Sequence, residues 1–386
     1  MPLNYASLEK FASNFIEQTL QRHNEMLIAA KRLKALFEQA SLEPDRLREA
    51  VEQAERTQPT LYTAKPTHEY PLASFPLPAQ PLRFTLLAAD GSQIAPNRHR
   101  ALEFGLINIG LFKVRFGSAQ PPSVDLISEL LEFDRLFSEG MLIGDDEVGL
   151  HRDLRERVLI REHITSEDPT PVLTVTDGPL DLFYRSNIKG GAAQDAQQTV
   201  WELDRRLEKE GILSAGYIDK PGSTMLANML NIYQSTLENQ SVTTIMEKTV
   251  SDRVLLKGKL APGHRSALFE IISKRSPVNP QRLRCAFFFM NVAREADAEW
   301  LVRVEVPYWL AQKPELVDFV HTALYHDAQV LDSHPYPYSL HRAHELALVR
   351  FAESDEIEAM LMSKLPPEAA DLFPTQSHKS HWKGSV

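Results

Sequence analysis

The residues of this chain best suited to chemistry are two aspartates that each follow a short apolar run. Leu86-Leu87-Ala88-Ala89 leads into Asp90-Gly91-Ser92, and Leu173-Thr174-Val175-Thr176 leads into Asp177-Gly178-Pro179. A strand buried in a sheet delivers its last residue to the edge where ligands bind, and the glycine lets the chain turn there. Two carboxylates held in this way are hard oxygen ligands for Mg²⁺ or Mn²⁺. The alternative is that each Asp-Gly pair is only a turn.

A charged segment, His151–His163, stands before the strand of the second aspartate and could supply a further acid. Arg152 and Glu156 are four residues apart and share a face if this segment is helical. Glu162 is the competing carboxylate for the same role. The alternative for the whole segment is a solvated charged face.

A third candidate segment lies near the C-terminus, where two prolines precede a helix expected from about Ser339. It carries Tyr336, His341 and His344. A histidine can ligate a metal ion or act as a general acid or base, and a tyrosine can orient a phosphate. The alternative is that these are structural or surface residues.

The elements that must position these residues are short apolar strands alternating with helical patterns. Strands are expected at 84–89, 106–116 (as one strand or two), 172–176, 213–218, 286–292 and 300–306, and helices at 124–137, 151–163, 201–210, 314–326 and 341–354. Strands mixed with helices, some of them adjacent in sequence, predict an α/β domain with a mixed sheet flanked by helices.

The N-terminal part has a different pattern. Apolar residues recur at helical spacing over 5–56, and Pro44 is placed as the first residue of a second helix. We therefore expect an N-terminal helical hairpin within 1–58 that packs on the core or on a second subunit. The six prolines from Pro59 to Pro81 exclude a helix or a central strand, so 59–82 is expected to be an extended connector. The main domain is expected over 83–366, and a loosely ordered tail over 367–386.

Composition limits the classes of function. Forty-two basic and 52 acidic residues give a net charge of −10, which does not favour non-specific electrostatic binding to nucleic acid or anionic lipid. No window approaches the ~18 uncharged apolar residues of a membrane span. The single cysteine, Cys285, lies in an apolar run and is expected to be a buried thiol in a reducing, cytoplasmic protein. No G-x-x-x-x-G-K-[ST] loop is present in the sequence, so we expect no ATP motor in this chain.

Taken in order, these segments resemble the NurA nuclease family from about Leu86 to Leu348. The matching segments are Asp90-Gly91-Ser92, Arg152-x-x-x-Glu156, Thr176-Asp177-Gly178-Pro179-Leu180, Ala215-Gly216-Tyr217-Ile218-x-Lys220-Pro221, Ser251-Asp252-Arg253, Gly263-His264-Arg265-Ser266, and Tyr336-Pro337 with His344 eight residues after the tyrosine. No single segment is specific; the order and spacing carry the resemblance.

The resemblance implies a ribonuclease H-like fold and an active site that depends on Mn²⁺, with Mg²⁺ as the alternative ion. The expected catalytic residues are Asp90, Glu156, Asp177, Tyr336 and His344, of which Asp90, Glu156, Asp177 and His344 would hold the metal. Lys220 and Arg152 are the expected contacts to DNA. Glu162 stays open as the alternative to Glu156, because a polar insertion separates the helix from Asp177.

The function implied is a 5′→3′ DNA exonuclease, with endonuclease activity on single strands left open. Such a protein would form a homodimer, dock on a HerA-type hexameric ATPase and resect DNA ends for double-strand break repair by homologous recombination. A motor partner agrees with the missing ATP loop. Two rival functions remain: a non-catalytic DNA-end clamp or adaptor for the translocase, and a metal phosphohydrolase that acts on nucleotides.

Overall fold

A computed structural model describes residues 4–58, 60–79, 83–138, 140–181, 192–240, 250–273, 283–295, 298–331 and 334–366. The chain forms two compact units, each built from separate stretches of sequence. The first unit comprises Met1–Ala79, Ile218–Asn279 and Arg284–Tyr325, and the second comprises Gln80–Tyr217, Pro280–Leu283 and His326–Val386. The predicted linear division at residues 58, 82 and 366 stays a prediction, and the expected tail lies outside the described residues.

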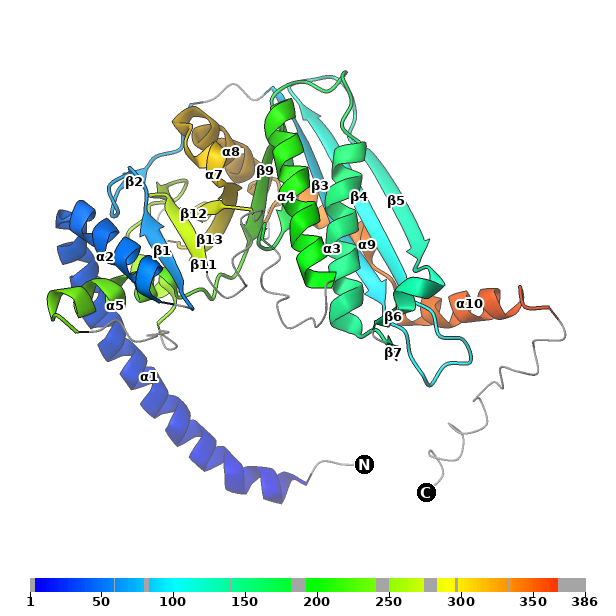
Figure 1. Cartoon of the computed structure of the whole chain (residues 1–386), viewed down its shortest axis with the longest axis horizontal. Coiled ribbons are helices and arrows are strands. Elements are labelled where there is room, and N and C mark those ends of the chain that lie inside the picture. Colours follow the sequence, from blue (N-terminus) through cyan, green and yellow to red (C-terminus); the bar gives the residue numbers. More distant parts are fainter. Residues whose placement is uncertain are drawn as a thin grey trace. The chain divides into compact units, whose positions relative to one another are not determined.

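The first unit contains an antiparallel sheet and several helices (Figure 1). Its elements are α1 (Tyr5–Leu42), α2 (Pro44–Thr57), β1 (Tyr62–Pro66), β2 (Ser74–Phe75), α5 (Met225–Leu237), α6 (Asp252–Leu256), β10 (Arg265–Ser266), β11 (Phe269–Ser273), β12 (Cys285–Asn291), β13 (Leu301–Pro307), α7 (Tyr308–Ala311) and most of α8 (Pro314–Ala328). The main strands pair in the order β1-β11-β12-β13, all antiparallel. Cys285 begins the buried strand β12, as expected for a core thiol.

The N-terminal helices follow the sequence pattern. Pro44 is the first residue of α2, which buries Leu47, Ala50, Val51 and Ala54. The proline-rich segment contributes β1 and β2, with a turn closed by a hydrogen bond from the backbone N–H of Ala73 to the carbonyl of Tyr70. Its expected role as a connector stays a prediction. Among the described residues β1 pairs with β11 alone, at an edge of the sheet where prolines are tolerated.

The second unit contains the candidate residues at positions 90, 156, 177, 336 and 344. Its elements are β3 (Phe84–Ile94), β4 (Leu106–Phe116), β5 (Ser123–Leu130), η1 (Phe133–Leu136), β6 (Phe137–Ser138), β7 (Met141–Leu142), α3 (Asp145–Glu162), β8 (Val172–Asp177), α4 (Ala192–Glu210), β9 (Leu213–Ile218), α9 (Tyr338–Ala347) and α10 (Phe351–Met362). The strand order is β5-β4-β3-β8-β9. Pairing is antiparallel from β5 to β3 and parallel from β3 to β9. In chain order this is 3-2-1-4-5, the strand order of the expected ribonuclease H-like mixed sheet.

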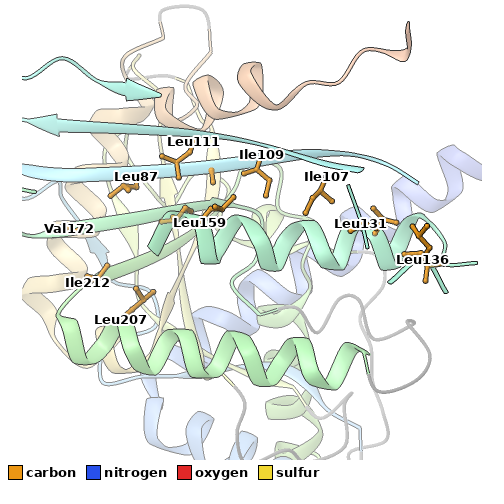
Figure 2. Packing of buried hydrophobic residues seen from close by; sticks show 14 residues of the cluster. Leu87, Ile107, Ile109, Leu111, Leu131, Leu136, Leu159, Val172, Leu207 and Ile212 are labelled. Carbon is orange, nitrogen blue, oxygen red and sulfur yellow. The ribbon is translucent and has the colours of Figure 1, made fainter. Parts of the chain in front are cut away.

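Helices cover both faces of this sheet (Figure 1). Figure 2 shows apolar side chains of β3 and β4, among them Leu87, Ile109 and Leu111, packed in one cluster with Leu159 of α3 and Leu207 of α4. Burial of each leucine stabilises the fold by about 1.5–3 kcal/mol. Because side chains alternate along a strand, Leu87 and Ala89 of this cluster point to the α3 face, and Asp90 points to the opposite face, where α9 packs.

Two of the helix predictions are wrong. Residues 124–137 form β5, η1 and β6 instead of a helix, because Ser123 to Leu130 pair with β4 along a sheet edge. The expected helix 341–354 is broken into α9 and α10. The carbonyl of Ala347 accepts hydrogen bonds from the side chains of Ser92 and Asn108 instead of continuing the helical ladder.

Candidate active site

Asp90 and Asp177 occupy neighbouring positions on two parallel strands. The pairing of β3 with β8 ends at Ala89 and Thr176, so the two aspartates are the next residues of their strands. Asp177 ends β8 as expected, whereas β3 runs on to Ile94 and stays paired with β4. Matching positions of paired strands present their side chains to the same face. Both carboxylates therefore belong to the α9 face.

His344 of α9 is in direct contact with Asp90. Its Nδ1 lies 2.6 Å from Oδ2 of Asp90, and its side chain is 57% exposed. The other carboxylate oxygen of Asp90 accepts a hydrogen bond from the backbone N–H of Gly91 at 2.9 Å. The structure thus joins two of the predicted residues that are 254 positions apart in the sequence.

A close approach between α9 and β4 places His344. Gly110 is the register partner of Asp90, and a Cβ atom on Gly110 would lie 2.3 Å from the carbonyl oxygen of Ala343. Only glycine lets the helix come so near. The end of α9 is fixed where Ser92 and Asn108 bond to the carbonyl of Ala347.

The start of α9 is fixed by a buried aspartate. Asp327 accepts hydrogen bonds from the backbone N–H of Ser339 at 3.2 Å and from its hydroxyl at 2.5 Å. Burial raises the pKa of Asp327 to about 6, although the two bonds from Ser339 act to lower it. Asp327 therefore caps the first turn of the helix that carries His344.

Tyr336 also belongs to this unit. Its ring lies 5.7 Å from the ring of Tyr217 in an edge-on arrangement, and Tyr217 is the register partner of Asp177. By the same alternation, Tyr217 shares a sheet face with Asp177. Asp90, Asp177, Tyr336 and His344 are therefore associated with one face of the sheet.

Glu156 approaches from the other face, on α3. A Cβ atom on Gly91 would lie 2.6 Å from Oε1 of Glu156 and 2.7 Å from Cγ of Arg152, so the glycine makes room for both side chains. Glu156 is buried. Burial, with the negative charges of Asp153 and Asp90, raises the pKa of Glu156 to about 8 against the opposing effect of Arg152.

Arg152 is engaged with these acids. Its Nε lies 3.2 Å from Oε1 of Glu156, and its Nη2 donates to Oδ1 of Asp153 at 2.8 Å. Burial acts to lower the pKa of Arg152, but the charges of Glu156, Asp153 and Asp90 raise it above its usual value. Arg152, predicted as a DNA contact, is thus a partner of the buried acids.

Two further predicted residues lie elsewhere. Glu162, the alternative to Glu156, is more than half exposed and forms an ion pair with Arg155 at 3.2 Å. Lys220 is an exposed residue of the first unit, whereas all five predicted catalytic residues belong to the second.

The residues of the second unit suit a hard cation by their donor chemistry. Oε1 of Glu156 is buried and receives no hydrogen bond from any described residue, with only the ion-pair contact to Arg152 beside it. Such an oxygen is suited to a cation. Across the described ranges, however, no three acidic, histidine or cysteine side chains meet closely enough to hold a metal ion as they stand. Asp90 projects from β3 to one face and Glu156 reaches the neighbouring Gly91 from the other, and the negative charge of Asp90 helps to raise the pKa of Glu156.

Sequence reasoning missed Asp327 and three further residues that shape this site. Gly110 and Asn108 lie inside an apolar strand pattern, and Asp153 lies inside the charged helix next to Arg152. A glycine within a run such as Leu106–Phe116 is a signal of close backbone approach. Asp153 is buried, a property that its charged neighbours in the sequence conceal.

No helix of the described chain is both long enough and apolar enough to cross a membrane.

Comparisons with known proteins agree with the resemblance noted from the sequence. A family model described as the NurA domain matches residues 84–349. No curated protein sequence matches the chain.

Among solved structures, the NurA nuclease from Sulfolobus solfataricus is 12% identical, with 91% of this chain and 97% of that chain covered and a TM-score of 0.49. Endonuclease V from Ciona intestinalis, solved in complex with DNA, is 10% identical over 71% of this chain and 87% of that chain, with a TM-score of 0.33. Drosophila Piwi is 11% identical over 70% of this chain and 30% of that chain, with a TM-score of 0.30.

The family model spans well over half of the sequence, including both aspartates, Glu156, Tyr336 and His344. The chain therefore belongs to the NurA family.

Proposed function

We propose that this chain is a metal-dependent DNA nuclease that hydrolyses phosphodiester bonds at the site around Asp90. Membership of the NurA family supports nuclease activity at the general level. The observation that carries the proposal is the contact of Asp90 with His344 at 2.6 Å, one residue from the glycine that Glu156 packs against. A purely structural role does not require an acid and an exposed histidine at the end of a parallel strand pair.

The contact with Asp90 fixes the proton on His344. A carboxylate only accepts hydrogen bonds, so Nδ1 of His344 donates to Asp90, and in the neutral ring the lone pair is on Nε2. The histidine side chain is 57% exposed, so a substrate phosphodiester can reach the ring. His344 can then accept a proton from the attacking water or act as a cation ligand, while Asp90 keeps the ring oriented.

The proposed metal ligands are Asp90, Asp177, His344 and Glu156. When bound, Mn²⁺ or Mg²⁺ would lower the pKa of a water and offset negative charge at the phosphate. Glu156 is preferred over Glu162 because it is buried beside Gly91, whereas Glu162 is neutralised by Arg155 in solvent. Tyr336 is proposed to orient the phosphate.

The finer parts of the proposal rest on the family. They are 5′→3′ exonuclease activity with endonuclease activity on single strands, a homodimer, a HerA-type ATPase as motor, and a cytoplasmic role in end resection for recombination. The sequence has no Walker A loop, which agrees with a separate motor.

The test is digestion of 5′- and 3′-labelled linear DNA by the purified full chain with Mn²⁺, Mg²⁺ or EDTA. Asp90→Ala should abolish metal-dependent products, and Glu162→Gln should retain them. The label pattern gives the polarity. If neither the protein alone nor a mixture with the hexameric ATPase cuts DNA, the nuclease proposal fails and a DNA-end clamp replaces it.

A further inference from the structure

A hollow of the first unit combines cations with an aromatic ring. Lys220, Arg253, Lys257 and Trp300 line it, together with the carboxylates of Asp219 and Glu299, and it encloses about 410 Å³. This volume is in the range of pockets that hold small organic ligands, about 300–1,000 Å³. The site around Asp90 does not use any of these residues.

The walls of the hollow are held in place by hydrogen bonds. The indole Nε1 of Trp300 donates to Asp219 at 2.8 Å, and its backbone N–H donates to Asn291 at 2.9 Å. Glu299 accepts from the backbone N–H of Gly258 at 2.7 Å. Asp219 is therefore bonded to the tryptophan of the hollow and Glu299 to the backbone next to Lys257, and the Asp219 bond orients the ring of Trp300.

A buried aspartate explains how Arg253 is presented. Asp252 is fully buried and accepts bonds from the hydroxyl of Ser223 and from the backbone N–H groups of Met225, Leu226 and Ala227. This anchor ties α6 to the start of α5. The Ser251-Asp252-Arg253 segment singled out in the sequence thus has one buried structural member and one cation at the hollow.

The three cations of the hollow are exposed. In the ranges that the structure describes, none of them forms an ion pair with a carboxylate. With Asp219 and Glu299 included, the hollow has one positive charge in excess on a chain of net charge −10. Local positive charge at an aromatic platform is the combination that binds single-stranded nucleic acid, because phosphates meet the cations and a base stacks on the ring.

We propose that this hollow binds one or two nucleotides of single-stranded DNA, with a base stacked on Trp300 and phosphate at Arg253, Lys257 and Lys220. The inference rests on the proposed function for its ligand, since a DNA nuclease must hold a strand, but it assigns a site separate from the residues that cut.

The test is fluorescence anisotropy of labelled oligo(dT) with the full chain in EDTA, so that cleavage does not interfere. Trp300→Ala should weaken binding about tenfold or more, and Trp300→Phe should stay within about threefold because stacking is kept. Arg253→Gln with Lys257→Gln should weaken binding and lower the slope of log K against log[salt] by about 1.4, as expected for two lost phosphate contacts on a single strand.

The matched control is a second tryptophan and lysine of the same unit. Lys313 lies over the ring of Trp309, with Nζ 5.7 Å from the centroid, outside the hollow. Trp309→Ala and Lys313→Gln should bind oligo(dT) as the unmodified chain does. Circular dichroism checks that each variant is folded. If Trp300→Ala unfolds, the binding of the Trp300→Phe variant and of the Arg253→Gln/Lys257→Gln double variant tests the proposed site instead.

The inference is overturned if Trp300→Ala binds as tightly as the unmodified chain, or if the control variants lose as much. It is also overturned if inorganic phosphate competes as well as the oligonucleotide does, since stacking would then contribute nothing. These outcomes are independent of cleavage. If the Trp300→Ala variant loses binding but the unmodified chain never cuts DNA, only the nuclease proposal is refuted. If the variant binds normally and the unmodified chain cuts DNA, only this binding site is refuted.

Discussion

Gly110→Ala tests how α9 is positioned, because it adds one carbon atom where the helix crosses β4. That carbon would lie 2.3 Å from the carbonyl oxygen of Ala343, 2.7 Å from Cβ of Leu346 and 2.9 Å from the backbone nitrogen of Ala347. Ordinary contact begins near 3.4 Å, so α9 must retreat by about 1 Å. All three obstacles belong to the helix close to its backbone and cannot rotate away.

The retreat has consequences for both stability and cleavage. Overpacking of this kind costs about 1–3 kcal/mol of unfolding free energy. The Nδ1 atom of His344 would move from 2.6 Å toward about 3.6 Å from Asp90, which is beyond a hydrogen bond. A displacement of about 1 Å in a catalytic group lowers the rate by about 10²-fold.

The assay combines urea unfolding with the Mn²⁺-dependent cleavage rate, measured on protein shown to be folded at the assay temperature. Gly222→Ala is the control, because a Cβ atom there meets nothing within 4 Å. A Gly110→Ala protein that cuts DNA at the unmodified rate would refute the positioning of His344 by this crossing.

Three further predictions concern the surroundings of the site. Glu156→Gln should stabilise the metal-free protein near pH 8 but not near pH 4. The pKa of Glu156 in the folded protein is raised to about 8, so the unmodified chain loses stability as the pH rises from about 4.5 to 8. Thermal unfolding of both proteins across this pH range checks the prediction. Gly91→Ala should lower the cleavage rate strongly while changing the free energy of unfolding little, because its Cβ atom would displace the carboxylate of Glu156. The cleavage rate and the urea midpoint of the variant, each compared with those of the unmodified chain, check this. Ser339→Ala should cost about 1–3 kcal/mol in urea unfolding because it leaves the buried Asp327 without its hydroxyl partner; a midpoint equal to that of the unmodified chain would contradict the cap.

Much of the second unit could be predicted from local pattern. The strands at 106–116 and 213–218 have the predicted bounds, because apolar and β-branched runs there are bordered by clear breaks. The placement of Asp90 and Asp177 after apolar strand residues was also predicted, and each directly follows the last pair of β3 with β8.

Other features depend on contacts that a local pattern does not encode. Residues 123–130 alternate weakly and become a strand only by pairing with β4. The break after α9 arises where Ser92 and Asn108, more than 230 residues away in sequence, bond to Ala347. That Glu156 and His344 come to the same stretch of β3 from opposite faces required the sheet register, and so did the role of Gly110.

The division into units was also beyond the sequence. Both units are assembled from distant stretches, and the chain passes from the second to the first between Tyr217 and Ile218, inside a single strand. A proline-rich segment marks a possible domain boundary in the sequence, whereas a boundary inside a strand leaves no such mark.

The cleavage rates of two aspartate variants decide whether the active site lies at Asp90. Asp90→Asn alters the pair with His344, and Asp125→Asn alters an exposed pair with His163 at 2.9 Å, in the same unit. With Mn²⁺ and labelled linear DNA, we expect Asp90→Asn to lower the cleavage rate by at least about 10²-fold and Asp125→Asn to retain it, both proteins being folded. Equal rates in the two variants would contradict the assignment of the active site.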